Sequence, residues 1–327
     1  MTSLVTGATG FIGEALVRKL LDRGEDVRVL VRSRAKLERL GLPVDDVVEG
    51  DITDPDAVRR ATEGIDVVYA IAGTFREAQL ADRDYRAVNV EAVGTLLNAA
   101  IENGVARVVH CSTCGIHGSI NGSPADENHE IRPVGIYEET KAAGERLAFE
   151  LGRADGVEVT AIRPTPVYGP GDTRLLKLFK LARRSPTILI GDGMAAYHLV
   201  YIDDLTDAFL LAGTTPGVAG EAFLIGGPEI PSLNEILRTL AALDGREKLD
   251  FVRVPAKPVW LAGWLCEAVC RPIGVNPPIY RRRVEFFMNN RAYKIDKARN
   301  LLGYEPKVSL REGLSRTAEW YRKQGLL

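Results

Sequence analysis

The sequence predicts an α/β protein in which a doubly wound parallel sheet is followed by a smaller mixed α/β domain. Runs of β-branched residues alternate with helical patterns over residues 1–164, and such alternation is typical of parallel sheets. The first strand passes into a helix through a turn that carries Gly7, Gly10 and Gly13, as the first βαβ unit of such a sheet requires. The alternation is less regular over 165–327, where we expect the second domain.

Composition and charge argue against several classes of protein. The 327 residues are 46% hydrophobic and 26% charged, which is a globular composition. The net charge of −2 argues against a nucleic-acid partner, and four cysteines in so long a chain do not indicate a secreted disulfide framework. The start runs directly into a core strand without a signal peptide, and no apolar run is long enough for a transmembrane segment. We therefore expect a cytoplasmic protein.

The glycine turn predicts a site for a dinucleotide. Gly7 allows the backbone to turn sharply, Gly10 allows close approach of a pyrophosphate, and Gly13 lets the helix pack near the sheet. The N-terminus of that helix offers N–H groups to the phosphates. The predicted cofactor contacts in this turn are Gly7, Thr9, Gly10, Phe11 and Ile12.

The residue after the second strand, 27–31, indicates which dinucleotide is bound. An acidic residue there accepts hydrogen bonds from the ribose 2′-OH of NAD, whereas a basic residue pairs with the 2′-phosphate of NADP. The position holds Arg32, whose planar fork suits a phosphate. We therefore predict NADP, with NAD as the second choice; a solvated basic loop is the alternative interpretation.

The ends of the next strands supply further predicted cofactor contacts. A strand over 44–48 leads to Asp51, whose carboxylate can accept a hydrogen bond from the adenine amino group, and to Ile52. A strand over 66–71 ends in small residues that leave room for ribose and diphosphate, namely Ala70, Ala72 and Gly73.

Two later segments, 200–205 and 221–225, are expected to return to the main sheet. The loop over 115–133 is longer than most connections within a domain, which is typical of a substrate lid. The other predicted elements are strands over 107–111 and 157–162 and helices over 84–103, 137–151 and 310–325.

Tyr137 and Lys141 indicate proton transfer beside a hydride-carrying cofactor. They are spaced i and i+4, so they share one helix face. A nearby ammonium stabilises a phenolate and lowers the pKa of a phenol from its ordinary value of about 10. Thr113 follows the neighbouring strand, where its hydroxyl can hold a substrate oxygen against Tyr137. The alternative, a surface pair, is disfavoured by the place of these residues after the fifth strand.

Further motifs extend this pattern almost to the C-terminus. Together with the glycine turn and Tyr137-x-x-x-Lys141, they are Asp51-Ile52, Asn89, Ser112-Thr113 with Gly118, Arg163-Pro164 with Tyr168-Gly169-Pro170, Val200-Tyr201-Ile202-Asp203-Asp204 and Leu302-Gly303-Tyr304-x-Pro306.

With these motifs the chain resembles the extended short-chain dehydrogenase/reductase family, within the NAD-dependent epimerase/dehydratase superfamily. The resemblance implies a Rossmann-type NAD(P)-binding domain over 1–164, with return segments near 198–226, and a substrate-binding domain over 165–327. It implies that Thr113, Tyr137 and Lys141 are catalytic. It also implies cofactor contacts at Asn89, Tyr137, Lys141, Pro164 and Val167.

Departures from the pattern of nucleotide-sugar epimerases favour another branch. The segment after Arg163-Pro164 lacks their asparagine, and 195–199 lacks their arginine. The C-terminal half looks instead like the 3β-hydroxysteroid dehydrogenase and dihydroflavonol reductase branch. An apolar helix over 255–270 can wall an apolar substrate; a core or dimer helix is the alternative. The expected substrate contacts are Thr74, Cys114, His117, Thr165 and Tyr197.

Two functions follow as hypotheses. The first is an NADP-dependent reductase or dehydrogenase of a secondary alcohol or ketone, with Tyr137 as general acid or base. The second is a nucleotide-sugar epimerase or dehydratase that retains NAD. Arg32 favours the first, and the intact Thr113, Tyr137 and Lys141 disfavour a catalytically silent NADP-binding regulator. The motifs do not distinguish the substrate or the direction of reaction.

Other features receive weaker interpretations. Cys111 and Cys114 have a redox-motif spacing, but a redox or metal site is disfavoured, and no metal is predicted. The run 281–283, three arginines, is expected to be a solvated helix face, with a phosphate or an anionic membrane surface as the alternative. The resemblance to the family implies a homodimer through the helices of Asn89 and Tyr137. Small residues that would permit close packing there are Ala99, Ala100, Ala142, Ala143 and Gly144.

Overall fold

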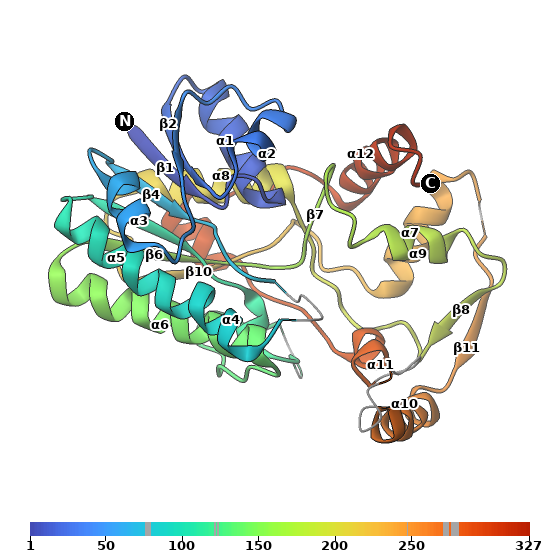
Figure 1. Cartoon of the computed structure of the whole chain (residues 1–327). Helices are drawn as coiled ribbons and strands as arrows, with labels where there is room; N and C mark the ends of the chain where they lie inside the picture. Colours follow the sequence, from blue (N-terminus) through green and yellow to red (C-terminus); the bar gives the residue numbers. More distant parts are fainter. Residues whose placement is uncertain (76–79, 121, 123, 247, 271–274, 276–280) are drawn as a thin grey trace.

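A seven-stranded parallel sheet forms the centre of the computed structural model, which describes residues 1–327 except 76–79, 121, 123, 247, 271–274 and 276–280 (Figure 1). The strand order is β3-β2-β1-β4-β5-β6-β10. Successive strands are added on one side of β1 up to β3 and on the other side from β4 onward, so the strand order reverses between β1 and β4. In doubly wound sheets the ligand crevice lies at the carboxyl ends of the strands at such a point. The strands are β1 (Thr2–Thr6), β2 (Asp26–Val31), β3 (Asp46–Glu49), β4 (Val67–Ala70), β5 (Arg107–Cys111), β6 (Glu158–Pro164) and β10 (Ala222–Ile225).

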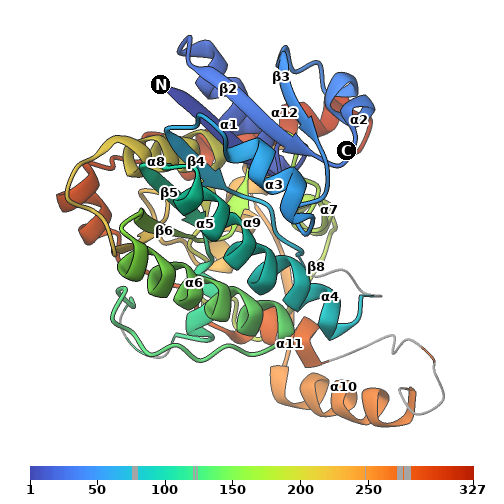
Figure 2. The same ribbon diagram turned by 60° about the vertical axis from the view of Figure 1, so that its left-hand side comes forward.

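Successive strand residues face opposite sides of this sheet, and helices cover both sides (Figures 1 and 2). Val5 and Val29 belong to one apolar cluster, whereas their neighbours Leu4 and Leu30 belong to another. This two-residue period buries both faces of each strand, as parallel sheets require. The first cluster includes residues of α1 (Phe11–Asp22), α2 (Arg34–Arg39) and α8 (Ile202–Thr214); the second includes residues of α3 (Pro55–Thr62), α5 (Ala92–Glu102) and α6 (Ile136–Asp155).

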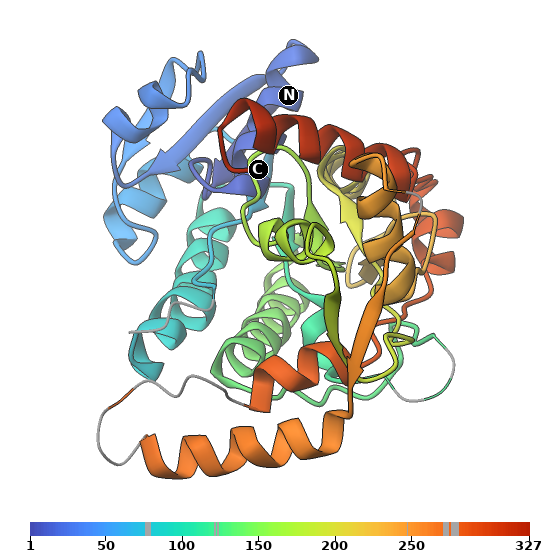
Figure 3. The ribbon, with the colours of Figure 1, turned by 90° about the vertical axis from the view of Figure 1, so that its right-hand side faces the viewer.

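Most of the elements that follow β6 form a smaller part beside the carboxyl ends of the strands of the main sheet (Figures 1 and 3). Two short parallel pairs link it together, β7 (Val167–Tyr168) with β9 (Val200–Tyr201) and β8 (Thr187–Ile190) with β11 (Phe251–Val254). Its helices are α7 (Leu176–Ala182), α9 (Leu233–Leu243), α10 (Ala256–Cys270), α11 (Arg281–Met288) and α12 (Leu310–Lys323). The π-helical turn η4 (Ala298–Leu302) lies instead against β10 and α8 of the main part (Figure 1).

The structure corrects two predicted elements. Residues 200–205 are not a strand of the main sheet: Val200 and Tyr201 pair with β7, and α8 begins at Ile202. Asp203 and Asp204 lie in the first turn of α8, where acidic side chains stabilise the helix dipole. Of the two predicted returns, only 221–225 supplies a main-sheet strand, β10.

The predicted helix over 84–103 is a helical run in three parts. These are α4 (Asp82–Arg86), a π-helical turn η1 (Ala87–Glu91) and α5. The π-helical turn contains Asn89, so the change of helical winding coincides with a residue that the sequence marks as functional. The predicted lid over 115–133, of which 121 and 123 lie outside the described residues, overlaps the 3₁₀ turn η2 (Cys114–His117). Ile120 and Ala125 pack with Tyr293 in a small apolar cluster.

Candidate active site

The turn between β1 and α1 has the shape that a dinucleotide needs. Gly7 has φ +72°, and a Cβ there would lie 2.8 Å from the backbone nitrogen of Ala72. A Cβ on Gly13 would overlap the carbonyl oxygen of Gly7. Gly10 is exposed, and α1 begins at Phe11 without a side-chain cap. The residues present therefore fit a bound diphosphate, because uncapped N–H groups at a helix N-terminus attract phosphate oxygens.

Arg32 and Asp51 lie at the ends of the neighbouring strands β2 and β3. Arg32 is exposed, and Asp51 and Ile52 are half-buried. The Asp51 Oδ1 atom accepts hydrogen bonds from the Thr53 nitrogen at 2.9 Å and from the Thr53 hydroxyl at 2.7 Å. Burial raises the pKa of Asp51, but these hydrogen bonds and the charge of Arg32 outweigh it, so the pKa lies below its ordinary value. A carboxylate and a guanidinium thus border this end of the crevice.

Asn89 ties the end of β4 to the α6 helix. Its buried side chain accepts a hydrogen bond from the Thr74 nitrogen at 2.9 Å and donates to the Thr74 carbonyl at 3.2 Å. It also donates to the Thr140 hydroxyl at 3.1 Å. Asn89 therefore fixes the backbone at Thr74, which follows the predicted cofactor residues Ala70, Ala72 and Gly73.

Lys141 reaches the same place from α6. Its ammonium donates a hydrogen bond to the Cys111 carbonyl, and a Cβ on Gly73 would lie 3.8 Å from Nζ and 3.3 Å from the Asn89 side-chain oxygen. Burial lowers the pKa of Lys141 below its ordinary value, and the nearby Cys111 and Glu145 partly offset this effect. Gly73, Asn89 and Lys141 thus meet beside the ends of β4 and β5.

Tyr137 lies one helical turn before Lys141 in α6, and Thr113 lies two residues after Cys111 at the end of β5. Tyr137 is half-buried in the first turn of α6, and its ring packs edge-to-face on Phe75 with the centroids 4.9 Å apart. The Thr113 hydroxyl accepts a hydrogen bond from the Gly115 nitrogen at 3.1 Å. A Cβ on Gly115 would lie 3.3 Å from both the Thr113 hydroxyl and the Glu138 Cγ. Gly115 therefore lies against both Thr113 and the first turn of α6, where a side chain at this position would crowd both.

Several predicted residues are buried in the protein. His117 is 1% exposed; its Nδ1 lies 3.3 Å from the Glu130 carbonyl and its Nε2 lies 3.3 Å from Arg163 Nη1. Burial, and then the charge of Arg163, lower the pKa of His117. The imidazole of His117 is thus packed between Glu130 and Arg163, and its predicted contact with substrate stays a prediction. The other predicted contacts that are buried are Ala70, Asn89, Cys114, Lys141, Pro164, Thr165 and Val167.

The remaining predicted contacts are more accessible. Thr9, Phe11, Ile12, Thr74 and Tyr197 are half-buried. Tyr197 lies in the smaller part of the chain, where the Arg291 guanidinium stacks 5.2 Å from its ring centroid.

The structure adds residues that the sequence did not indicate. The Arg174 guanidinium lies over the Phe11 ring at 5.6 Å and over the Phe75 ring at 5.5 Å, and Phe75 in turn packs on Tyr137. These contacts join the glycine turn to the Tyr137 helix through a residue of the smaller part. Phe75 and Arg174 carry no spacing signal, because their contacts arise between segments far apart in sequence.

A buried ion pair supports the helix of Tyr137 and Lys141 from beneath. Arg163 binds Glu145 through two hydrogen bonds, Nε to Oε2 at 3.0 Å and Nη2 to Oε1 at 2.5 Å, and the two side chains are 7% and 5% exposed. The spacing of Glu145, four residues after Lys141 on the same helix, is the signal that sequence reasoning missed.

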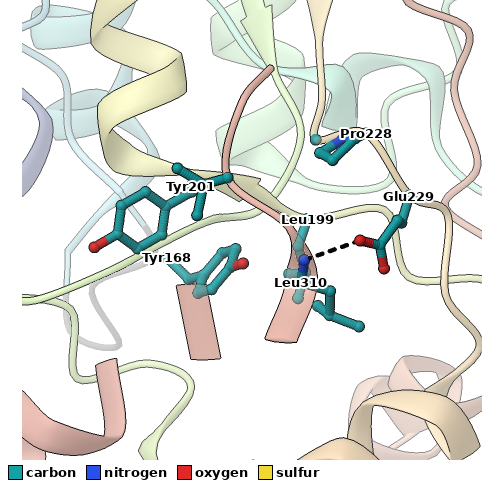
Figure 4. Close-up of a pocket in the computed structure, with 8 residues that line it drawn as sticks. Tyr168, Leu199, Tyr201, Pro228, Glu229 and Leu310 are labelled. Atoms are coloured by element: carbon teal, nitrogen blue, oxygen red, sulfur yellow. Dashed lines mark hydrogen bonds between the residues drawn. The ribbon is translucent and has the colours of Figure 1, made fainter. Parts of the chain in front are cut away.

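Two hollows in the described part of the chain lie away from this cluster. One is the small hollow lined by Tyr168, Tyr201 and Leu310 (Figure 4), where Glu229 accepts a hydrogen bond from the Leu310 nitrogen at 3.1 Å. This hydrogen bond holds the start of α12, and the hollow is lined by none of the residues of the candidate site. The other is lined by residues of α8 and the segment 303–307. Among the described residues, no cluster of three His, Cys, Asp or Glu side chains is placed to hold a metal ion.

The family model of the NAD-dependent epimerase/dehydratase family matches residues 3–226. The chain belongs to this family. The match covers the central sheet and the Tyr137 helix, and it confirms the predicted family and the Rossmann-type fold. The protein is therefore an NAD(P)-dependent dehydrogenase or epimerase.

Individual relatives align with nearly the whole length of this chain. It is 32% identical to a 2-alkyl-3-oxoalkanoate reductase of Stenotrophomonas maltophilia, over 97% of this chain and 98% of the relative. It is 33% identical to a 3β-hydroxysteroid dehydrogenase/Δ5→4-isomerase of Mycobacterium tuberculosis, over 97% and 90%. Among solved structures, MoeE5 in complex with UDP-glucuronic acid and NAD is 25% identical, with a TM-score of 0.75 over 99% of this chain and 100% of that chain.

Proposed function

We propose that this protein is an NADP(H)-dependent reductase or dehydrogenase that interconverts a ketone and a secondary alcohol. The meeting of Lys141, Asn89 and Gly73 beside the half-buried Tyr137, at the ends of β4 and β5, carries the proposal. This arrangement supplies a phenol for proton transfer and an ammonium in the crevice where a dinucleotide binds.

The proposed roles of the chain's residues follow from their places. Tyr137 gives a proton to the substrate oxygen in reduction and takes it back in oxidation; a bound nicotinamide would supply or accept the hydride. Thr113 holds the substrate oxygen toward Tyr137. The Lys141 ammonium orients the nicotinamide ribose and stabilises the phenolate. Asn89 fixes the backbone at Thr74 and so would help to shape the strand end that holds the cofactor.

The proposed preference for NADP rests on Arg32. This exposed guanidinium follows β2 directly, where the ribose 2′-position of a bound dinucleotide lies. Arg32 follows β2 and Asp51 follows β3, the strand that pairs with β2, and the charge of Arg32 contributes to lowering the pKa of Asp51.

The proposed substrate is apolar and carries a ketone or hydroxyl group. The names of the two relatives, a 3-oxoalkanoate reductase and a hydroxysteroid dehydrogenase, support this class. The second candidate is a nucleotide-sugar epimerase that retains NAD, and the likeness to MoeE5 with UDP-glucuronic acid and NAD favours it.

The proton-transfer role is tested by Tyr137→Phe. The variant keeps the ring that packs on Phe75 but lacks the phenol oxygen. The turnover number for an apolar ketone substrate is expected to fall by about 10²–10⁴, the usual contribution of a positioned acid or base. The dissociation constant of NADPH should stay unchanged. Thr113→Val is expected to lose less activity, and Lys141→Met to weaken both turnover and cofactor binding. Near-full activity of Tyr137→Phe would refute the mechanism.

The state of the cofactor in purified protein separates the two candidates. The reductase should release NADP(H) on dialysis and consume one NADPH for each ketone reduced. An epimerase should retain NAD and convert a UDP-sugar without net consumption of cofactor. Both measurements are made on the same preparation, so a protein that retains NAD and epimerises a UDP-sugar would replace the first candidate by the second.

A further inference from the structure

Helix α10 exposes its apolar face to solvent, whereas a surface helix of a globular protein normally buries that face. Its outer stripe is apolar: Leu261 is 52% exposed, Trp264 44%, Leu265 51% and Val269 66%. These positions recur at i, i+3, i+4 and i+8 and therefore form one face. In an ordinary surface helix such a face packs against the core, and the opposite face carries the polar residues.

The inner face of α10 holds its polar contacts. Glu267 is 5% exposed and accepts hydrogen bonds from the Arg281 nitrogen at 2.8 Å and from the Arg281 guanidinium. The Trp260 indole donates to Glu285 at 3.2 Å, and Arg281 lies over the Trp260 ring. The polar side is therefore already used to bind α11, and the helix cannot turn its apolar side inward without breaking these contacts.

The location of α10 leaves this apolar face directed away from the rest of the protein. In Figures 2 and 3 the helix lies at the edge of the molecule, with α11 between it and the remaining elements. α10 has 15 residues, about 22 Å at 1.5 Å per residue, which is shorter than the hydrocarbon thickness of a bilayer. Among the described helices, none is long and apolar enough to cross a membrane. The occupant of this face must therefore contact α10 along its side.

Charge distinguishes between the possible occupants. Residues 251–283 contain six basic residues and one acidic residue, Glu267, in a chain of net charge −2. Arg253 and Lys257 are exposed beside the start of α10, whereas Glu267 is buried and paired. A second copy seated on this face by two-fold symmetry would bring the same basic segment against itself. An anionic surface would instead be attracted by it.

We propose that α10 docks the protein on a lipid bilayer that contains anionic headgroups. The helix lies in the plane of the interface, with Leu261, Trp264, Leu265 and Val269 among the acyl chains and Arg253 and Lys257 at the headgroups. This is the arrangement of an interfacial amphipathic helix, in which buried apolar area and attraction to anionic lipid act together.

Flotation with vesicles tests the proposal on the full-length protein. Wild type is expected to float with phosphatidylcholine vesicles that contain about one third phosphatidylglycerol, and to bind them less at high salt. Leu261→Ser/Leu265→Ser should lower the bound fraction by about tenfold or more, because interfacial binding scales with buried apolar area. Lys257→Glu should weaken binding to the anionic vesicles. The matched control is Leu301→Ser in η4, whose leucine is 49% exposed, and it should float like wild type.

Circular dichroism and thermal unfolding establish that the variants are folded, which the exposed positions of Leu261 and Leu265 lead us to expect. Failure of folded wild type to bind anionic vesicles would overturn the proposal, and so would equal binding by the double variant. If light scattering shows an oligomer that Leu261→Ser/Leu265→Ser dissociates, while neither protein floats, a second copy covers the face instead. None of these readouts depends on enzymatic activity.

Discussion

Replacing Glu145 by glutamine should destabilise the fold by about 3 kcal/mol or more. The variant keeps the shape of the side chain but leaves the Arg163 guanidinium buried without a counter-charge. Two charge-assisted hydrogen bonds, at 2.5 and 3.0 Å, join side chains that are 7% and 5% exposed. Bonds to charged groups contribute about 1.5–3 kcal/mol each, and breaking a buried pair costs about 3–5 kcal/mol. Glutamine retains one acceptor, so the lower end of this range is expected.

Urea titration followed by circular dichroism measures the loss at neutral pH. The matched control is Glu14→Gln, which breaks the Arg18–Glu14 pair, whose side chains are 46% and 29% exposed. This exposed pair should contribute no more than about 0.5 kcal/mol. The double variant Glu145→Leu/Arg163→Met should be less destabilised than the sum of its single variants, because neither charge is then left alone. A loss below about 1 kcal/mol for Glu145→Gln, or one no larger than the control's, would contradict the reasoning.

Three further predictions concern the cofactor, acid stability and helix packing. Arg32→Asp should raise the dissociation constant of NADP by about 10- to 150-fold, because one charge-assisted pair is lost, and should change that of NAD much less. Fluorescence titrations with each dinucleotide measure both constants, and equal changes would reject this role of Arg32. Burial, and then the charge of Lys141, hold the pKa of His110 well below its ordinary value, so the unfolded chain takes up a proton below about pH 6.5 that the folded protein cannot bind. Stability in urea should therefore fall between pH 6.5 and 5, and His110→Leu should reduce that fall. Gly144→Ala should lower the free energy of unfolding by about 1–3 kcal/mol, because the new Cβ would overlap the Asn89 carbonyl. The helical control Gly94→Ala should be tolerated in thermal unfolding, because its Cβ would meet only a flexible leucine at 3.3 Å.

The predicted homodimer remains a prediction, but part of its basis changes. Ala99, Ala100 and Gly144 are buried within the single chain, and Gly144 lets α6 approach the Asn89 backbone. These small residues therefore serve packing inside the protein. Light scattering at micromolar concentration measures the oligomeric state, and a monomer would reject the dimer.

Local patterns in the sequence determined the central sheet and the order of its elements. Strand periodicity, the glycine turn and the i, i+4 spacing of Tyr137 and Lys141 depend on residues close together in the chain, so they can be recognised without the fold. The structure has Gly7 at φ +72° and Lys141 beside Gly73, as a strand-turn-helix crevice requires. The ends of the elements were predicted less accurately: the third strand spans 46–49, whereas the sequence predicted 44–48.

Only the tertiary structure decided which distant residues meet. Residues 200–205 have the apolar pattern of a strand, yet α8 forms there because its apolar face packs over the sheet with α1. The spacing of Glu145 from Lys141 places it on the same helix face, but its pairing with Arg163 depends on the fold. The contacts of Arg174 also arise between segments that no local spacing relates. The direction of the apolar face of α10 was decided in the same way. The sequence shows an apolar helix, but its polar contacts with α11 turn Leu261 and Leu265 outward, because the buried Glu267 needs Arg281 as its partner.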